Sequence, residues 1–173
     1  MRRRHVVLVG LPGAGKSVVG RLVAAALRAR FVDVDEDVER RAGKSVARLF
    51  AEDGEPAFRA LEAEIGAAAL DGAAAVIAPG GGFVADGVTR AKARGSGLVV
   101  YLQTEPADAA ARLGAAADRP LLAGGDVAAR LAMLLARRGA AYAEAECTVP
   151  TGGRTAEQVA AAVVSLARAR AGW

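Results

Sequence analysis

Eight residues near the N-terminus form the clearest chemical pattern in the chain. Residues 10–17 read GLPGAGKS, which fits the G-x-x-x-x-G-K-[ST] spacing of a loop that binds phosphate groups. The glycines let backbone N–H groups turn toward phosphate oxygens, and the N-terminus of a following helix adds positive potential. In such a loop the lysine reaches the β- and γ-phosphates of ATP, and the serine hydroxyl is a ligand of Mg²⁺. The pattern predicts nucleotide contacts from Gly13, Ala14, Gly15, Lys16, Ser17 and Val18.

The segments around this loop decide between a nucleotide site and an ordinary glycine-rich turn that caps a helix. Residues 5–9 are apolar and mostly β-branched, which is typical of a short buried strand. Residues 17–28 carry apolar side chains at helical spacing. The motif requires this strand–loop–helix context, so we favour the nucleotide site. Only three of the 23 basic residues are lysine, and Lys16 is one of them, where a compact charge on a flexible stem suits a phosphate.

Two carboxylates, Asp33 and Asp35, stand at the end of the second apolar segment. Alternation along a strand over residues 31–34 predicts that they point to the same side, near the strand ends where ligands bind in such folds. Phosphoryl transfer needs one acid near Mg²⁺ and another to orient or deprotonate the attacking hydroxyl. A calcium loop is excluded, because Val38 and Lys44 would stand where that loop has glycine and glutamate. A solvated acidic helix start remains the alternative.

The class of nucleotide-binding protein follows from residues that are missing from the sequence. A GTPase reads guanine with an asparagine–lysine–x–aspartate segment, and this sequence contains no asparagine. A motor or AAA-type ATPase has an apolar strand that ends in an acid, whereas residues 74–78 lead into Pro79 and three glycines. The group of small kinases remains.

Elsewhere, short apolar segments alternate with helical patterns. Such alternation indicates βαβ units and a parallel sheet covered on both faces. We therefore predict a three-layer α/β fold with five parallel strands, in a single domain over residues 1–173. The predicted strands are 5–9, 31–34, 74–78, 97–102 and 147–149, and the predicted helices are 17–28, two short ones in 38–50 broken near Gly43, 55–70, 106–113, one that runs through Tyr142, and 155–170.

Composition excludes several other function classes. The net charge of +4 and pI near 9.8 would suit a nucleic-acid partner, but beyond position 4 the basic residues are scattered among acids and aromatic residues are few. A site for small anions explains the excess charge equally well. No segment approaches the roughly 20 apolar residues of a membrane span. With a single cysteine and no cleavable leader after Met1, we predict a cytoplasmic protein without nucleic-acid or membrane partners.

Six motifs follow one another along the chain in an order that is informative. They are the phosphate loop, the acidic strand end over 31–35, Gly54-Glu55 followed by Phe58-Arg59 and Glu62, the triplet Gly80-Gly81-Gly82, Arg119-Pro120-Leu121-Leu122, and Arg138 with Tyr142 four residues on. In this order and spacing the chain resembles the shikimate kinase family along nearly its whole length. The resemblance implies strand order 2-3-1-4-5, substrate-binding helices at about 34–62, a mobile lid at about 113–125, and a monomer that phosphorylates shikimate with ATP and Mg²⁺.

The resemblance also implies a role for each motif residue. Arginine pairs bidentately with a planar carboxylate, glycine permits close backbone approach, and a lid arginine completes charge stabilisation on closure. The implied roles are Mg²⁺ binding through water by Asp33, hydroxyl binding and base catalysis by Asp35, carboxylate binding by Arg59 and Arg138, backbone approach to the ring at Gly80, Gly81 and Gly82, pocket walls from Phe50 and Phe58, contact with the transferring phosphate by Arg119 and Lys16, and adenine contacts from Arg112 and Arg154.

Some positions depart from the family pattern. Gly139 and Ala140 stand where asparagine and proline are usual, so Arg137 is an alternative to Arg138 as the carboxylate ligand. Val18 stands where a second hydroxyl residue is common. Two other functions stay open: a kinase of the same fold that acts on gluconate or a nucleotide, and a non-catalytic relative that only binds nucleotide.

Overall fold

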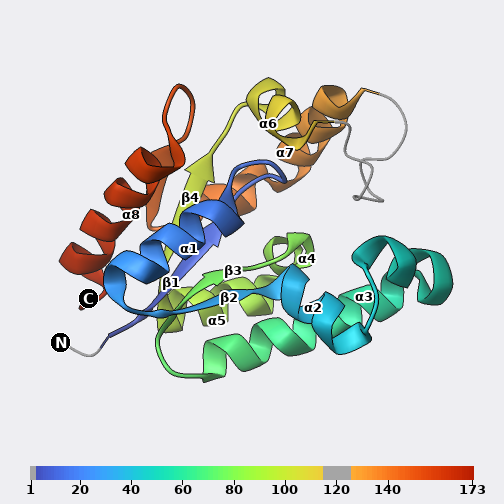
Figure 1. Ribbon diagram of the computed structural model, residues 1–173, viewed down its shortest axis with the longest axis horizontal. Coiled ribbons are helices and arrows are strands. Elements are labelled where there is room, and N and C mark those ends of the chain that lie inside the picture. The colour runs from blue at the N-terminus through green and yellow to red at the C-terminus, as the bar shows by residue number, and fades with distance from the viewer. Residues whose placement is uncertain (1–2, 115–125) are drawn as a thin grey trace.

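The computed structural model describes residues 3–114 and 126–173, and its centre is one sheet of five parallel strands (Figure 1). The strand order is β2-β3-β1-β4-β5, which confirms both the predicted parallel sheet and its order. In register, Val7 of the central strand lies beside Ile77 and Leu8 lies beside Val100. The strands are β1 (His5–Val9), β2 (Arg30–Asp33), β3 (Ala75–Ala78), β4 (Gly97–Gln103) and β5 (Cys147–Pro150).

Helices cover both faces of the sheet because side chains of the central strand alternate between two apolar clusters. Val6 and Leu8 pack with helices α1 and α8, whereas Val7 and Val9 pack with the helices of the opposite layer. The first layer contains α1 (Lys16–Leu27) and α8 (Ala156–Arg170), and the second contains α2 (Val34–Ala42), α3 (Val46–Asp71), α4 (Gly81–Ala85), α5 (Gly87–Ser96) and α7 (Val127–Ala143). The predicted three-layer fold is therefore confirmed.

One edge of the sheet collects the segments that carry chemistry. The carboxyl ends of the parallel strands meet there, and the strands continue into the phosphate loop, α2, α4, α6 (Pro106–Leu113) and the loop before α8. The phosphate loop packs so closely on its neighbours that side chains would not fit. A Cβ on Gly10 would lie 2.7 Å from the carbonyl oxygen of Leu102, and one on Gly13 would lie 2.5 Å from that of Ala109.

Two local predictions were wrong. The second strand ends at Asp33 and helix α2 begins at Val34, so strand alternation does not place Asp35. The physical reason is that the Asp33 side chain accepts hydrogen bonds from the N–H groups of the next turn and caps a helix. The sequence prediction also left out α4 and α5. The predicted break between residues 50 and 55 is confirmed, because α3 is non-helical at Gly54 (φ 83°) and kinks there.

No helix within the described ranges is both long and apolar enough to cross a membrane.

Two glycines inside helices should respond oppositely to the same substitution. Gly139→Ala in α7 should raise the free energy of unfolding by about 0.5–1 kcal/mol, because alanine loses less backbone entropy and the new Cβ meets no described atom within 4 Å. Gly20→Ala in α1 should lower it by about 1–3 kcal/mol, because the new Cβ would overlap the ring of Phe31.

Urea denaturation checks this pair. The signal is the fluorescence of Trp173, the single tryptophan, whose indole N–H donates to the carbonyl oxygen of Arg4 at 2.9 Å in the folded state. Stability changes of the same sign in both variants would contradict the packing described here.

Candidate active site

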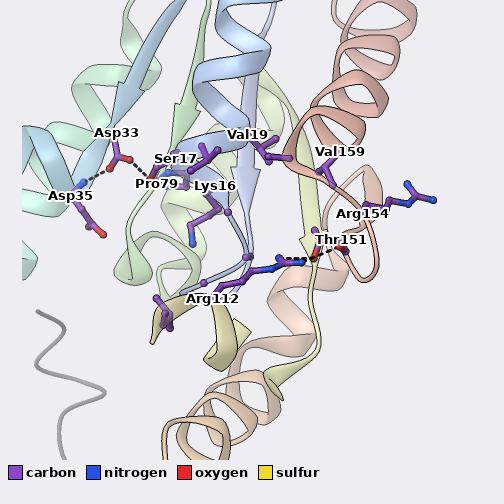
Figure 2. Close-up of a pocket in the computed structure, with 17 residues that line it drawn as sticks. Lys16, Ser17, Val19, Asp33, Asp35, Pro79, Arg112, Thr151, Arg154 and Val159 are labelled. Atoms are coloured by element: carbon purple, nitrogen blue, oxygen red, sulfur yellow. Dashed lines mark hydrogen bonds between the residues drawn. The ribbon is translucent and has the colours of Figure 1, made fainter. Parts of the chain in front are cut away.

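A cavity of about 410 Å³ lies at the carboxyl edge of the sheet, and Figure 2 shows the side chains around it. It is lined by most of the phosphate loop and by residues that follow four of the five strands. The lining residues are Gly13, Ala14, Gly15, Lys16, Ser17, Val18, Val19, Asp33, Asp35, Ala78, Pro79, Arg112, Leu113, Thr151, Arg154, Ala156 and Val159. All six residues of the predicted phosphate contact therefore share one cavity with both predicted acids.

The phosphate loop holds its lysine over the cavity. The Lys16 ammonium group donates to the carbonyl oxygens of Gly10 and Leu11, each at 3.0 Å. Gly15 adopts a left-handed conformation (φ 88°) directly before α1, which is a position that favours glycine. The N-terminal N–H groups of α1 thus open onto the cavity, as an anion site at a helix start requires.

Ser17 and Asp33 join the phosphate loop to the second strand. The Ser17 hydroxyl donates to Oδ2 of Asp33 at 2.5 Å. The other carboxylate oxygen of Asp33 accepts from the N–H groups of Asp35 at 3.1 Å and Glu36 at 3.4 Å. One buried carboxylate therefore both starts α2 and faces the serine, which places Asp35 in the first turn of that helix at the cavity wall.

This oxygen pair fits Mg²⁺ better than a metal that needs a full set of protein ligands. Among residues 3–114 and 126–173, no group of three or more histidine, cysteine or acidic residues could hold a metal ion. Mg²⁺ keeps several waters and binds through one or two protein oxygens together with substrate phosphates. A serine hydroxyl and a carboxylate beside a phosphate loop are such a donor set.

The glycine triplet is surrounded by four charged side chains, which we call the charged shell: Asp35, Arg59, Glu62 and Arg138. A Cβ on Gly80 would overlap the carboxylates of Asp35 and Glu62. On Gly81 it would lie 2.9 Å from Nη1 of Arg138, and on Gly82 it would lie 3.0 Å from Nη1 of Arg59. None of the three glycines has a positive φ, so glycine is required here for space and not for conformation.

Arg59 is held in the charged shell by two carboxylates on its own helix. Its guanidinium bonds to Glu62 at 2.7 Å and to Glu55 at 3.1 Å. Burial on its own lowers the pKa of Arg59, but the hydrogen bonds and charges of Glu62 and Glu55 outweigh burial and raise that pKa. Arg59 therefore stays a cation although much of its side chain is covered.

Glu62 is a site residue to which the sequence analysis gave no role. Its side chain is only 3% exposed, and besides pairing with Arg59 it accepts the N–H of Gly82 at 2.9 Å. The i,i+3 spacing of an arginine and an acid on one helix was visible in the sequence. Its contact with the glycine triplet, however, depends on the position of α4, a helix that the sequence analysis did not predict.

Arg138 reaches the charged shell from α7, and Arg137 points to the exposed side of that helix. Tyr142, one turn after Arg138, is buried and stacks on Tyr101 with ring centroids 5.0 Å apart. Burial raises the pKa of Tyr142, and the nearby charge and hydrogen bonding of Arg138 partly oppose that rise. Tyr142 is therefore a neutral phenol beside Arg138. This contact remains although Gly139 directly follows the arginine.

The two predicted aromatic walls differ in exposure. The rings of Phe50 and Phe58 pack with centroids 4.9 Å apart at 46°. Phe58 is 5% exposed and belongs to the core, and the guanidinium of Arg59 lies 5.1 Å from its ring centroid. Phe50 is half-buried.

Arg112 and Arg154, the two predicted adenine contacts, both line the cavity, but their side chains point differently. Arg112 lines the cavity and bonds to Thr151, whereas Figure 2 shows the side chain of Arg154 directed away from Lys16. Arg119 and most of the predicted lid at 113–125 lie outside the described residues.

A parallel sheet in this order, with a phosphate loop after its first strand and acids after its second, is the fold of the small P-loop kinases. The family model for shikimate kinase matches residues 12–168. Two similar proteins are the shikimate kinases of Thermobifida fusca, 48% identical with 91% of each chain covered, and Salinispora arenicola, 48% identical with 92% of this chain and 95% of that one covered.

A solved structure agrees with these matches. The shikimate kinase from Acinetobacter baumannii in complex with shikimate superposes with a TM-score of 0.91 at 32% identity, covering 96% of this chain and 94% of that chain. The chain belongs to the shikimate kinase family.

The two acids that bond Arg59 should differ in their effect on stability. Glu62→Gln should lower the free energy of unfolding by about 1–3 kcal/mol, because it weakens buried hydrogen bonds to a charged partner and to a backbone N–H. Glu55→Gln removes an exposed partner of the same arginine. It should change the free energy of unfolding by less than about 1 kcal/mol. Urea unfolding of both variants measures the difference. Equal losses, or a larger loss in Glu55→Gln, would contradict the burial pattern.

Proposed function

We propose that this protein transfers the γ-phosphate of ATP to a ring hydroxyl of shikimate, which yields shikimate 3-phosphate and ADP. One observation carries the proposal. Asp35 lines the same cavity as Lys16 and also lies against Gly80 within the charged shell. A group that accepts a proton therefore stands between a site for phosphates and a site for a carboxylate, and the acceptor of a phosphoryl group must be held in that position.

The nucleotide end of the site supplies positive charge and metal ligands from the phosphate loop and the end of β2. N–H groups at the start of α1 and the ammonium of Lys16 face the phosphates, and Lys16 then exchanges its bonds to the loop carbonyls for phosphate oxygens. Ser17 and Asp33 would hold Mg²⁺, Asp33 through water. When bound there, the ion would supply positive charge against the charge that develops on the phosphate oxygens.

The acceptor end selects a small carboxylated polyol. Arg59 and Arg138 supply two guanidinium groups above the glycine triplet, and such groups pair bidentately with a carboxylate. Asp35 accepts the proton of the substrate hydroxyl. The hydroxyl oxygen then forms a bond to the γ-phosphorus of ATP, while the bond from that phosphorus to the ADP oxygen breaks. The helices over residues 34–62, with Phe50 and Phe58, enclose the substrate. By family resemblance, Arg119 on a lid at 113–125 contacts the transferring phosphate.

A substrate panel tests this proposal directly. Purified protein with ATP and MgCl₂ should release ADP in a coupled assay when shikimate is present, and it should release far less with gluconate or nucleoside monophosphates. Phosphorus NMR of the product should show one new phosphomonoester. ADP release with gluconate alone would reassign the acceptor, and nucleotide binding without turnover would reject the kinase. We also propose a monomeric, cytoplasmic enzyme, and sedimentation of the purified protein checks the monomer.

Asp35→Asn should lower kcat by about 10²-fold or more, because the variant keeps the shape of the side chain and loses the proton acceptor. ATP binding should stay close to wild type. Asp37→Asn is the matched control: Asp37 lies two residues further along α2 and pairs with Arg40 at 2.8 Å. Steady-state kinetics of both variants decide the role, and a near-normal kcat in Asp35→Asn would reject it.

Arg59→Ala should raise the KM for shikimate by about 10-fold or more, which is the scale of losing a hydrogen bond between charged partners. The KM for ATP should change by less than about twofold, because Arg59 does not line the phosphate loop. Arg137→Ala on the exposed side of α7 serves as the control. Since loss of the guanidinium would leave Glu62 buried without its partner, Arg59→Lys is tested in parallel. Equal changes in both KM values would count against carboxylate binding by Arg59.

A further inference from the structure

Arg112 is an exposed arginine whose guanidinium is nevertheless fixed by one residue of another element. Its Nη1 donates to the Thr151 hydroxyl at 3.1 Å, and its Nη2 donates to the Thr151 carbonyl oxygen at 3.0 Å. Arg112 lies in the last turn of α6, and Thr151 directly follows β5. Two parallel bonds to one residue set both the position and the plane of the guanidinium, which a long side chain on an exposed helix face would not otherwise maintain.

Thr151 is in turn fixed from behind by a second buried threonine. The hydroxyls of Thr151 and Thr104 lie 2.7 Å apart, and the residues are 1% and 2% exposed. Thr104 directly follows β4, and the Thr151 N–H donates to the carbonyl oxygen of Gln103 at 2.9 Å, so both threonines stand at neighbouring strand ends. A threonine hydroxyl has one proton and two lone pairs, so Thr151 can accept from Arg112 and still bond Thr104.

The place of this cluster in the cavity indicates which part of the ligand it meets. Figure 2 shows Asp33 and Asp35 on one side of Lys16, and Arg112 and Thr151 on the other. With phosphates at the lysine and the acceptor on the side of the acids, the base of the nucleotide extends toward Arg112. Val159 and Ala156 line the cavity there and supply apolar contact. A planar guanidinium packs well on the face of an aromatic base.

We propose that Thr151 is a positioning residue for nucleotide binding: it holds the guanidinium of Arg112 as a preformed surface on which the base stacks. This inference rests on the nucleotide half of the proposed function and is independent of the phosphate acceptor. Ordering a long side chain only when the ligand arrives costs affinity, and the bonds to Thr151 remove that cost by ordering Arg112 beforehand. Thr104 supports the hydroxyl and contacts no ligand.

The experiment compares a ligand that has a base with one that lacks it. Thr151→Val keeps the buried shape and removes the hydroxyl. It should weaken ADP binding, measured by titration calorimetry, by about three- to tenfold, the cost of ordering one long side chain. Binding of inorganic tripolyphosphate, which meets only the phosphate loop, should stay unchanged. In turnover assays the KM for ATP should rise while the KM for shikimate stays the same. A purely structural role would not separate ADP from tripolyphosphate.

Three further variants complete the test. Thr151→Ser restores the hydroxyl and should restore ADP affinity. Thr104→Val removes the support behind Thr151 but leaves the acceptor of Arg112 in place, so it should weaken ADP binding less than Thr151→Val does. Arg112 is exposed, so Arg112→Lys should leave folding intact. This variant should bind ADP more weakly, because the lysine ammonium group has no planar face on which a base can stack. Adding Thr151→Val to Arg112→Lys should cause little further loss, because both changes act through one group.

The outcomes that overturn the inference are distinct from failure of the proposed function. Wild-type ADP affinity in Thr151→Val or in Arg112→Lys would reject the proposed role of Thr151 and Arg112 as a preformed surface for the base. Equal weakening of ADP and tripolyphosphate, or additive losses in the double variant, would also reject it. These titrations contain no shikimate, so they decide the matter even if another acceptor replaces shikimate. Absence of ADP binding by the wild-type protein would instead reject the nucleotide half of the proposed function.

Discussion

The structure of the active site depends on the absence of side chains at the glycine triplet, residues 80–82. Two cations and two anions from α2, α3 and α7 occupy the volume in which side chains at 80, 81 and 82 would lie. Charges that are partly removed from water persist only when they are paired and hydrogen-bonded, and the bonds of Arg59 to Glu62 and Glu55 meet that condition. Glu62 carries much of this pairing, because it bonds both a guanidinium and the backbone of the triplet.

The charged shell and the phosphate loop are parts of one site because a single carboxylate connects them. Asp33 bonds the serine that ends the loop and caps the helix whose first turn carries Asp35. Asp33 ends β2, which β3 separates from β1 in the sheet, so its bond to Ser17 connects two segments whose strands are not neighbours. In phosphoryl transfer most of the rate enhancement comes from position and electrostatics, and this short connection fixes the position of Asp35 relative to the phosphate loop.

Local signals predicted the sheet and the phosphate loop, because strands buried on both faces and a glycine-rich loop before a helix are visible in a short window. Local signals gave a wrong prediction at Asp33, where the side chain caps a helix and the strand ends. They also missed α4 and α5, which are short and rich in glycine or polar residues. The triplet was predicted as a place of backbone approach to a ligand, and the structure adds that charged side chains lie where a Cβ on these glycines would be. The roles of Glu62 and Thr151 depend on contacts between elements, which spacing along the chain does not reveal.

The most direct measurement is a crystal structure of the protein with ADP, Mg²⁺ and shikimate bound together. The account predicts that the shikimate carboxylate lies within hydrogen-bond distance of the guanidinium groups of Arg59 and Arg138. It also predicts that a ring hydroxyl bonds Asp35 and points toward the terminal phosphate beside Lys16. A shikimate molecule bound with its carboxylate away from both arginines, or outside the cavity shared by Lys16 and Asp35, would contradict it.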